Sequence, residues 1–233
     1  MNSNEVLLEL ESLGTEPNRK VYARHGIRGP MFGVSSGAIG RLAKRIGIDD
    51  LLAVELWASG NHDARVLATR IADPAATRRP RIQSWAKDLG DYVLTDALAA
   101  LVARSPDAAA LREAFTADDD EWRSTLGWNL VALACAERIA TFDQELARRL
   151  TAIEAGIHGR PNRTRHAMNR ALIAIGKRGG AIGKRALAVA KAIGTVEVDH
   201  GETECKTKDA ATAIRAHTHP PATRTRSRRA ARS

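Results

Sequence analysis

The sequence is poor in aromatic residues and in long apolar runs, and each shortage excludes a class of protein. Phe, Trp and Tyr together make up 4% of the 233 residues. No segment alternates β-branched and polar residues as a half-buried strand does. No apolar run reaches the roughly 18 residues that a membrane-spanning helix needs. These absences argue against a β-rich domain and against a membrane protein, and they favour an all-α chain.

Cysteine is also scarce. Cys135 and Cys205 lie far apart in the sequence, so a disulfide framework is not expected. Cys135 lies in the apolar run VALACA and is expected to be a buried small side chain. The first residues carry acids within their apolar stripe and lack the basic region that opens a signal peptide. We therefore expect a cytoplasmic protein, and the net positive charge described next favours its association with the nucleoid.

Positive charge is abundant. The formal net charge is +9, which favours a polyanionic partner, nucleic acid before a membrane surface. Residues 215–233 hold six arginines and no acid. We therefore predict a folded domain over residues 1–215 and a disordered basic tail over residues 216–233. Two roles are open for the tail: it increases solubility, or it contacts phosphates without sequence preference.

One stretch sets the architecture, from Asp49 to Asp73. Asp49 is a suitable N-cap for a first helix, Gly60 suits a left-handed C-cap, and Asn61 can cap a second helix that Pro74 ends. Such a pair cannot bury its apolar stripe alone. Similar pairs recur at about 40-residue spacing, which matches HEAT-like repeats. The pairs are 35–73, 78–115, 118–157 and 162–194. The sequence thus predicts an all-α solenoid with a concave binding groove.

Several polar or large residues in the first pair have structural explanations. Trp57 follows Leu56 in an apolar helix and is expected in the core. Glu55 lies in the same helix, and we expect it to form a structural ion pair with Arg65 or Arg70 of the next helix. Asp63 directly follows the turn and is expected to be ordinary first-turn polarity, favoured by the helix dipole.

Asp199, His200 and Cys205 form a second polar group. Their spacing offers at most three ligands, which is a weak metal signal. A cysteine activated by His200 is a further possibility. The alternative is an ordered, hydrogen-bonded loop that closes the end of the solenoid. We expect no metal and no cofactor.

Four blocks of the sequence carry a family resemblance over roughly residues 20–215: GPMFGV, AKRIG, ELWASGNHDARVLATRIADP and WAKDLGDYVLTDAL. They resemble the DNA alkylation repair proteins, whose AlkD type comprises HEAT-like DNA glycosylases. The resemblance implies a monomeric enzyme that holds alkylated double-stranded DNA in its concave groove. It implies hydrolysis of the N-glycosidic bond of cationic N3- or N7-alkylated purines, without a cofactor.

The resemblance also assigns the site. The family has a tryptophan followed four residues later by an aspartate, and here these positions are Tyr92 and Asp96. As the catalytic residue, Asp96 would stabilise the oxocarbenium ion that forms on the sugar when the base departs. Tyr92 would contact sugar and base. Judged by the residues alone, Asp96 is a solvated helix acid and Tyr92 a hydrophobic staple at a helix start.

Two departures from the family pattern bear on activity. The family's groove arginine aligns with Thr125, with Arg123 one face away, and its second groove tryptophan falls near Arg170. Trp128 is a candidate for the missing aromatic wall. Arg123, Arg165 and Arg170 are expected to contact DNA. Two hypotheses remain: an alkylpurine glycosylase, or a non-catalytic helical-repeat module that binds nucleic acid or protein. A thiol-dependent site at Cys205 is a third.

Overall fold

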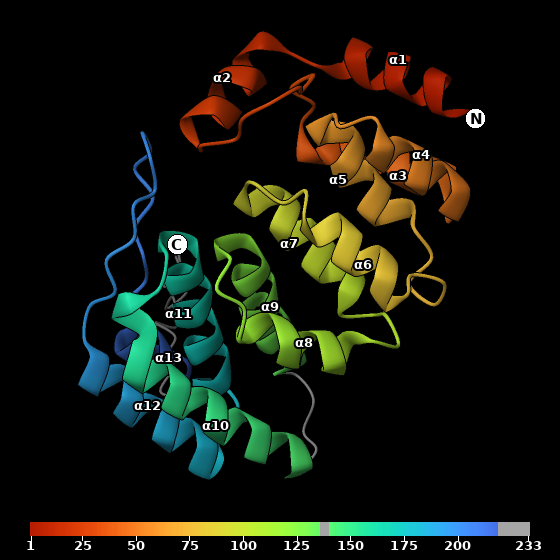
Figure 1. Cartoon of the computed structure of the whole chain (residues 1–233). Coiled ribbons are helices and arrows are strands. Elements are labelled where there is room, and N and C mark those ends of the chain that lie inside the picture. Colours follow the sequence, from red (N-terminus) through yellow and green to blue (C-terminus); the bar gives the residue numbers. More distant parts are fainter. Residues whose placement is uncertain (136–139, 219–233) are drawn as a thin grey trace, which may run out of the picture.

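The chain forms a stack of helices. A computed structural model describes residues 1–135 and 140–218, and within these ranges no strand occurs (Figure 1). The helices are α1 (Ser3–Leu13), α2 (Glu16–Arg24), α3 (Ser36–Ile46), α4 (Asp50–Ala58), α5 (His62–Ile71), α6 (Arg79–Ala86), α7 (Tyr92–Val102), α8 (Ala108–Thr116), α9 (Glu121–Ala134), α10 (Ala140–Gly156), α11 (Asn162–Gly176), α12 (Gly180–Ile193) and α13 (Ala210–Thr218). A short 3-10 helix (Ile157–Gly159) precedes α11. The predicted all-α class is confirmed.

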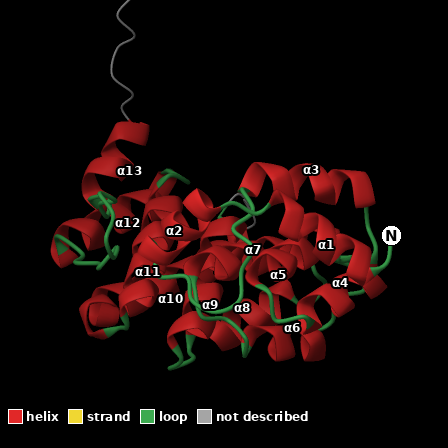
Figure 2. Ribbon diagram, turned by 90° about the horizontal axis from the view of Figure 1, so that it is seen from above, coloured by secondary structure: helices red, strands yellow, loops and turns green. Residues whose placement is uncertain are grey.

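The helices lie in two rows. In one row α5, α7, α9 and α11 each pack against the next, and α13 packs against α11. In the other row α4 packs on α5, α6 on α7, α8 on α9, and α10 on α11 and α12. Figure 2 shows the same stack from above. This is the predicted solenoid of helix pairs. Within the described ranges, no helix is both long and apolar enough to cross a bilayer.

Helix α9 joins the two halves of the core. Leu126 and Leu130 belong to a cluster that extends back to α1, whereas Trp128 and Val131 belong to one that extends to α13. The helix is buried on both sides because α7, α8 and α11 all pack against it. A Cβ on Gly127 would lie 2.4 Å from the backbone nitrogen of Thr116, so this glycine permits the close approach of α8.

The predicted caps of the central pair are present. The Asp49 side chain accepts a hydrogen bond from the backbone N–H of Leu52, and that of Asn61 accepts from Asp63 and Ala64. Gly60 has a φ of +73°, the left-handed conformation expected of it. Trp57 is 4% exposed and stacks on Trp85 with ring centroids 4.2 Å apart, so its assignment to the core is confirmed.

Some boundaries differ from prediction. The apolar pattern predicts a helix from Trp122 through Ala140, but α9 ends at Ala134, and residues 136–139 lie outside the described ranges. The predicted domain end at residue 215 falls inside α13, which continues to Thr218 and buries Ala211 and Ile214. The tail prediction for residues beyond 218 concerns residues that the structure does not describe.

The predicted ion pair of Glu55 is wrong. Glu55 is exposed, while Arg65 pairs with Asp88 at 3.3 Å and Arg70 donates to the hydroxyl and carbonyl of Ser36. Glu55 lies at the solvent side of α4, where an unpaired charge costs little. The two arginines therefore serve neighbouring elements instead.

Asp63 is more than first-turn polarity, so that expectation was also wrong. Its side chain is fully buried. It accepts hydrogen bonds from the backbone N–H groups of Phe32, Gly33 and Val34 at 2.7, 2.9 and 3.1 Å. The GPMFGV loop thus owes its shape to a carboxylate that lies about 30 residues further along the chain.

Candidate nucleic-acid interface

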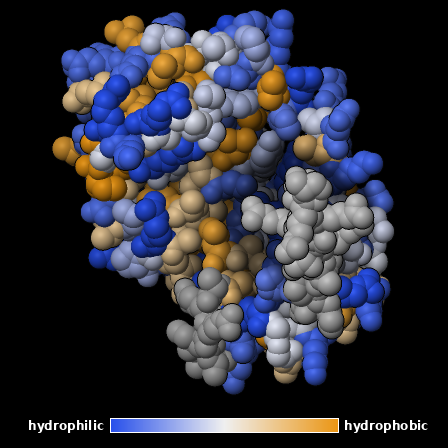
Figure 3. All heavy atoms as spheres, turned by 180° about the vertical axis from the view of Figure 1, so that it is seen from behind, coloured by the Kyte–Doolittle hydropathy of each residue, from blue (hydrophilic) through white to orange (hydrophobic). Residues whose placement is uncertain are grey.

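Three cavities meet at Asp96 on the row formed by α5, α7, α9 and α11. Their volumes are about 630, 380 and 110 Å³, and Asp96 lines all three. Seen from behind, the molecule is hollowed at the centre of one face (Figure 3). The three cavities have Asp96 in common as a lining residue, and we call them together the groove.

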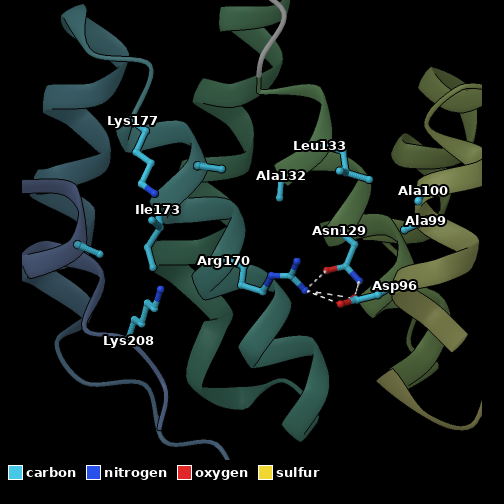
Figure 4. A pocket seen from close by; sticks show the side chains of 12 residues that line it. Asp96, Ala99, Ala100, Asn129, Ala132, Leu133, Arg170, Ile173, Lys177 and Lys208 are labelled. Atoms are coloured by element: carbon cyan, nitrogen blue, oxygen red, sulfur yellow. Dashed lines mark hydrogen bonds and ion pairs between the residues drawn. The ribbon is translucent and has the colours of Figure 1, made fainter. Parts of the chain in front are cut away.

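Asp96 does not stand free in the groove. It accepts a hydrogen bond from the Nδ2 of Asn129 at 2.8 Å, and the Nη1 of Arg170 lies 3.1 Å from both carboxylate oxygens (Figure 4). The side chains of Asp96 and Arg170 are 41% and 46% exposed, respectively, whereas Asn129 is buried. The triad joins α7, α9 and α11. The guanidinium offsets the negative charge of the carboxylate.

Tyr92 lies one turn before Asp96 and is also engaged. The guanidinium of Arg163 covers its ring at 4.9 Å from the centroid, and its hydroxyl lies 3.1 Å from the Nδ1 of His25. Burial raises the pKa of Tyr92, with Arg163 acting in the opposite direction. Tyr92 lines the smallest cavity, and Arg163 covers one face of its ring.

The smallest cavity also contains two neutral polar groups. The hydroxyl of Thr125 is buried with no hydrogen-bond partner among the described residues. Burial, with smaller contributions from repulsion by Arg170, His200 and Arg163, lowers the pKa of His166 to about 4. His166 is therefore an uncharged imidazole at neutral pH, so the positive charge of this site comes from arginine.

The groove is strongly cationic. Its only carboxylate among the described lining residues is Asp96. Against it stand Arg70 of α5, Arg104 after α7, Arg163 and Arg170 of α11, Lys177 at the end of α11, and Lys208 before α13. Cations from several repeats that line neighbouring cavities suit a ligand with many phosphates.

Two predicted DNA-binding arginines lie elsewhere. Arg123 is paired with Asp118 through two hydrogen bonds of 2.8 and 3.0 Å, and this contact lowers the pKa of Asp118. Arg165 donates a long hydrogen bond of 3.5 Å to Asn162. Neither lines the three cavities. Of the predicted site residues, the structure brings together Asp96, Tyr92 and Arg170.

Trp128 cannot form an aromatic wall of the groove, and that prediction was wrong. It is 2% exposed and belongs to the core cluster around α10 and α11. Asn129 is the groove residue that sequence reasoning missed. It lies one turn after Thr125 on α9, and residues four apart share a helix face, so the alignment of Thr125 with the groove carried a signal for Asn129.

The segment from Asp199 to Cys205 is an ordered loop, as one of the alternatives held. His200 bonds to the hydroxyl of Thr207 at 2.9 Å, not to Cys205. Asp199 is held to Asn162 by two hydrogen bonds, and a Cβ on Gly201 would meet the carbonyl oxygen of Arg24 at 2.8 Å. The loop therefore reaches α2. Within the described ranges, no cluster of three metal-ligating residues occurs.

A family model, two relatives and a solved structure each match most of this chain. The model of the family described as DNA alkylation repair enzyme matches residues 6–214. Two uncharacterized proteins, Lin0241 of Listeria innocua and Lmo0209 of Listeria monocytogenes, are each 26% identical over 208 residues, 87% of this chain and 91% of theirs. A solved structure is 30% identical with a TM-score of 0.85 over 94% of both chains. It is described as a new family of proteins related to the HEAT-like repeat DNA glycosylases with affinity for branched DNA structures.

Proposed function

Because this chain belongs to the DNA alkylation repair enzyme family, we propose that it binds DNA along the groove, with higher affinity for branched DNA than for a plain duplex. The observation that carries the proposal is the charge of the groove, where six arginines and lysines face one carboxylate. The residues that line the groove come from one chain, and the proposed binding unit is a monomer.

Phosphate contacts supply most of the affinity of such a surface. A protein that neutralises several phosphates releases the counterions that had condensed there. Arg70 lies in α5, Arg104 follows α7 and Lys177 follows α11, so the positive charges that line the groove come from three different helix pairs. The preference for branched DNA rests on the related structure, whose family has that affinity.

The geometry favours binding over base excision. Hydrolysis of the N-glycosidic bond needs a negative charge that faces the developing oxocarbenium ion. Here Arg170 contacts both oxygens of Asp96, and Asn129 donates to one of them. A cation at this distance opposes the build-up of positive charge on a sugar. By resemblance, the family's second groove tryptophan falls near Arg170, so this site would hold a positive charge in place of an aromatic wall.

A glycosylase acting on cationic N3- or N7-alkylated purines is the second candidate. It is favoured by the position of Asp96, which opens into the groove with its side chain 41% exposed and lies one turn from Tyr92. For hydrolysis, Arg170 would have to leave Asp96 and take a phosphate instead. Alkylated bases carry the positive charge that makes them good leaving groups. Neutral uracil should therefore remain attached to its deoxyribose, whether or not the chain is a glycosylase.

The test of the proposed function is a salt series. Dissociation constants for a plain duplex and a three-way junction of equal length are measured from about 0.05 to 0.2 M salt. Six phosphate contacts predict a loss of affinity on the order of 1,000-fold across this range, and tighter binding of the junction throughout. A flat salt response would contradict the proposal. Release of 7-methylguanine from methylated DNA, assayed in parallel, decides the second candidate.

A further inference from the structure

The largest cavity of the groove has an apolar floor and a charged rim. Small and aliphatic side chains from four elements form the floor: Ala99, Ala100, Ala132, Leu133, Ile173, Ala174 and Ala213. Leu133 stays 47% exposed there, which is costly for a leucine with no partner. Arg170, Lys177 and Lys208 stand at the rim beside Asp96 and Asn129. The volume of about 630 Å³ is within the range of about 300–1,000 Å³ typical of ligand pockets.

The charged groups at the rim have hydrogen-bond donors that no described residue accepts. Arg170 uses only its Nη1 toward Asp96 and Asn129. The ammonium groups of Lys177 and Lys208 contact no acceptor among the described residues. Figure 4 shows the two lysine side chains pointing toward the same part of the pocket, on either side of Ile173. The rim is therefore prepared for anionic oxygens directly above an apolar surface.

An apolar floor beneath a positively charged rim suits an unpaired nucleotide better than a paired duplex. A paired duplex presents phosphates but keeps its ring faces stacked, so it has nothing to place on an apolar floor. An unpaired nucleotide presents a flat ring together with its own phosphates. Small floor residues such as Ala132 and Ala174 leave room for a ring, and the donors of Arg170 and oxygens of Asp96 lie at its edge.

We infer that this pocket takes an unpaired nucleobase at a branch point or bulge in DNA. The ring lies on the alanine floor, and Lys177 and Lys208 contact the flanking phosphates. The inference rests on the proposed function, and it explains how a groove of this charge distinguishes branched from paired DNA. Removal of about 60 Å² of base surface from water, at about 25 cal/mol per Å², is worth roughly tenfold in affinity.

The experiment fills the pocket. Ala132→Leu and Ala174→Leu are combined, since both positions are partly exposed on helices and leucine is a good helix former. The measured quantity is the ratio of affinities for a three-way junction with unpaired bases and for a paired duplex. The ratio is expected to fall about tenfold. The matched control combines Ala110→Leu and Ala155→Leu, exposed helical positions outside the cavities, and should leave the ratio unchanged.

A second arm changes the DNA and keeps the natural chain. Replacing the unpaired bases by abasic sites should weaken junction binding about tenfold, and 2-aminopurine at those sites should change its fluorescence on binding. An unchanged ratio in the filled variant, or equal affinity for abasic and normal junctions, overturns the base pocket while DNA binding stands. If the natural chain binds neither DNA, the proposed function fails and the inference with it. If circular dichroism shows that the filled variant is unfolded, the abasic comparison decides alone.

Discussion

Replacing Asp96 by asparagine separates binding from catalysis. The amide keeps the size of the side chain and a hydrogen-bond acceptor for Asn129 and Arg170, but it removes the only carboxylate among the described groove residues. A phosphate held by Arg170 would lie close to that carboxylate, because Nη1 is only 3.1 Å from it. Two unit charges about 4 Å apart in water interact with about 1 kcal/mol, so Asp96→Asn should tighten DNA binding about fivefold at low salt.

The same variant should change stability little. Asp96 and Arg170 are both nearly half exposed, and exposed ion pairs contribute about 0–1 kcal/mol. If the chain also excises cationic bases, loss of the carboxylate should slow release about 100- to 1,000-fold. Fluorescence anisotropy measures the affinity, and chromatography of the released bases measures the rate.

The control is Asp143→Asn, which removes another ion-paired, half-exposed aspartate outside the cavities. It should tighten binding much less. If Asp96→Asn weakens DNA binding instead, the carboxylate acts by ordering Arg170 and its charge does not oppose phosphate. That result would refute the electrostatic reasoning.

Three further changes have defined outcomes. Asp63→Ala leaves three backbone donors without an acceptor and should lower the free energy of unfolding by about 3 kcal/mol or more in urea titrations; a loss below about 1 kcal/mol would contradict its role. The pKa of His166 is about 4 in the folded chain against 6.5 ordinarily, so the unfolded chain binds more protons as the pH falls through this window and stability declines. His166→Gln should flatten that decline. Deleting residues 219–233, which include five arginines, should weaken DNA binding at low salt without loss of helical circular dichroism.

Most of the fold could be predicted from interactions between residues that are close in sequence. The caps at Asp49 and Asn61 and the left-handed Gly60 depend on neighbours within a few residues, and the recurrence of such pairs indicates a solenoid. The end of α9 could not be predicted in this way, because the apolar run continues past Ala134. An apolar pattern alone does not show where a helix must stop.

The site was only partly predictable because its contacts are distant in sequence. Arg170 meets Asp96 across 74 residues, and Asp63 meets the GPMFGV loop across about 30. Two adjacent residues of α9 also lie on different faces of the helix. Trp128 points into the core, whereas Asn129 lines the groove. Family resemblance named Asp96 and Tyr92, but only the structure shows that arginines engage both.

The most direct test of DNA binding in the groove is to remove positive charges that line it. Arg104→Gln, Lys177→Gln and Lys208→Gln are combined and compared with a triple variant outside the cavities, Lys44→Gln, Arg148→Gln and Lys191→Gln, which carries the same change in net charge. With junction DNA at about 0.1 M salt, loss of three phosphate contacts should weaken binding about 100-fold or more and make the salt slope shallower by about 3. The control should change affinity by less than about threefold, since its charges lie outside the contact surface. Equal loss of affinity in both triple variants would contradict DNA binding in the groove.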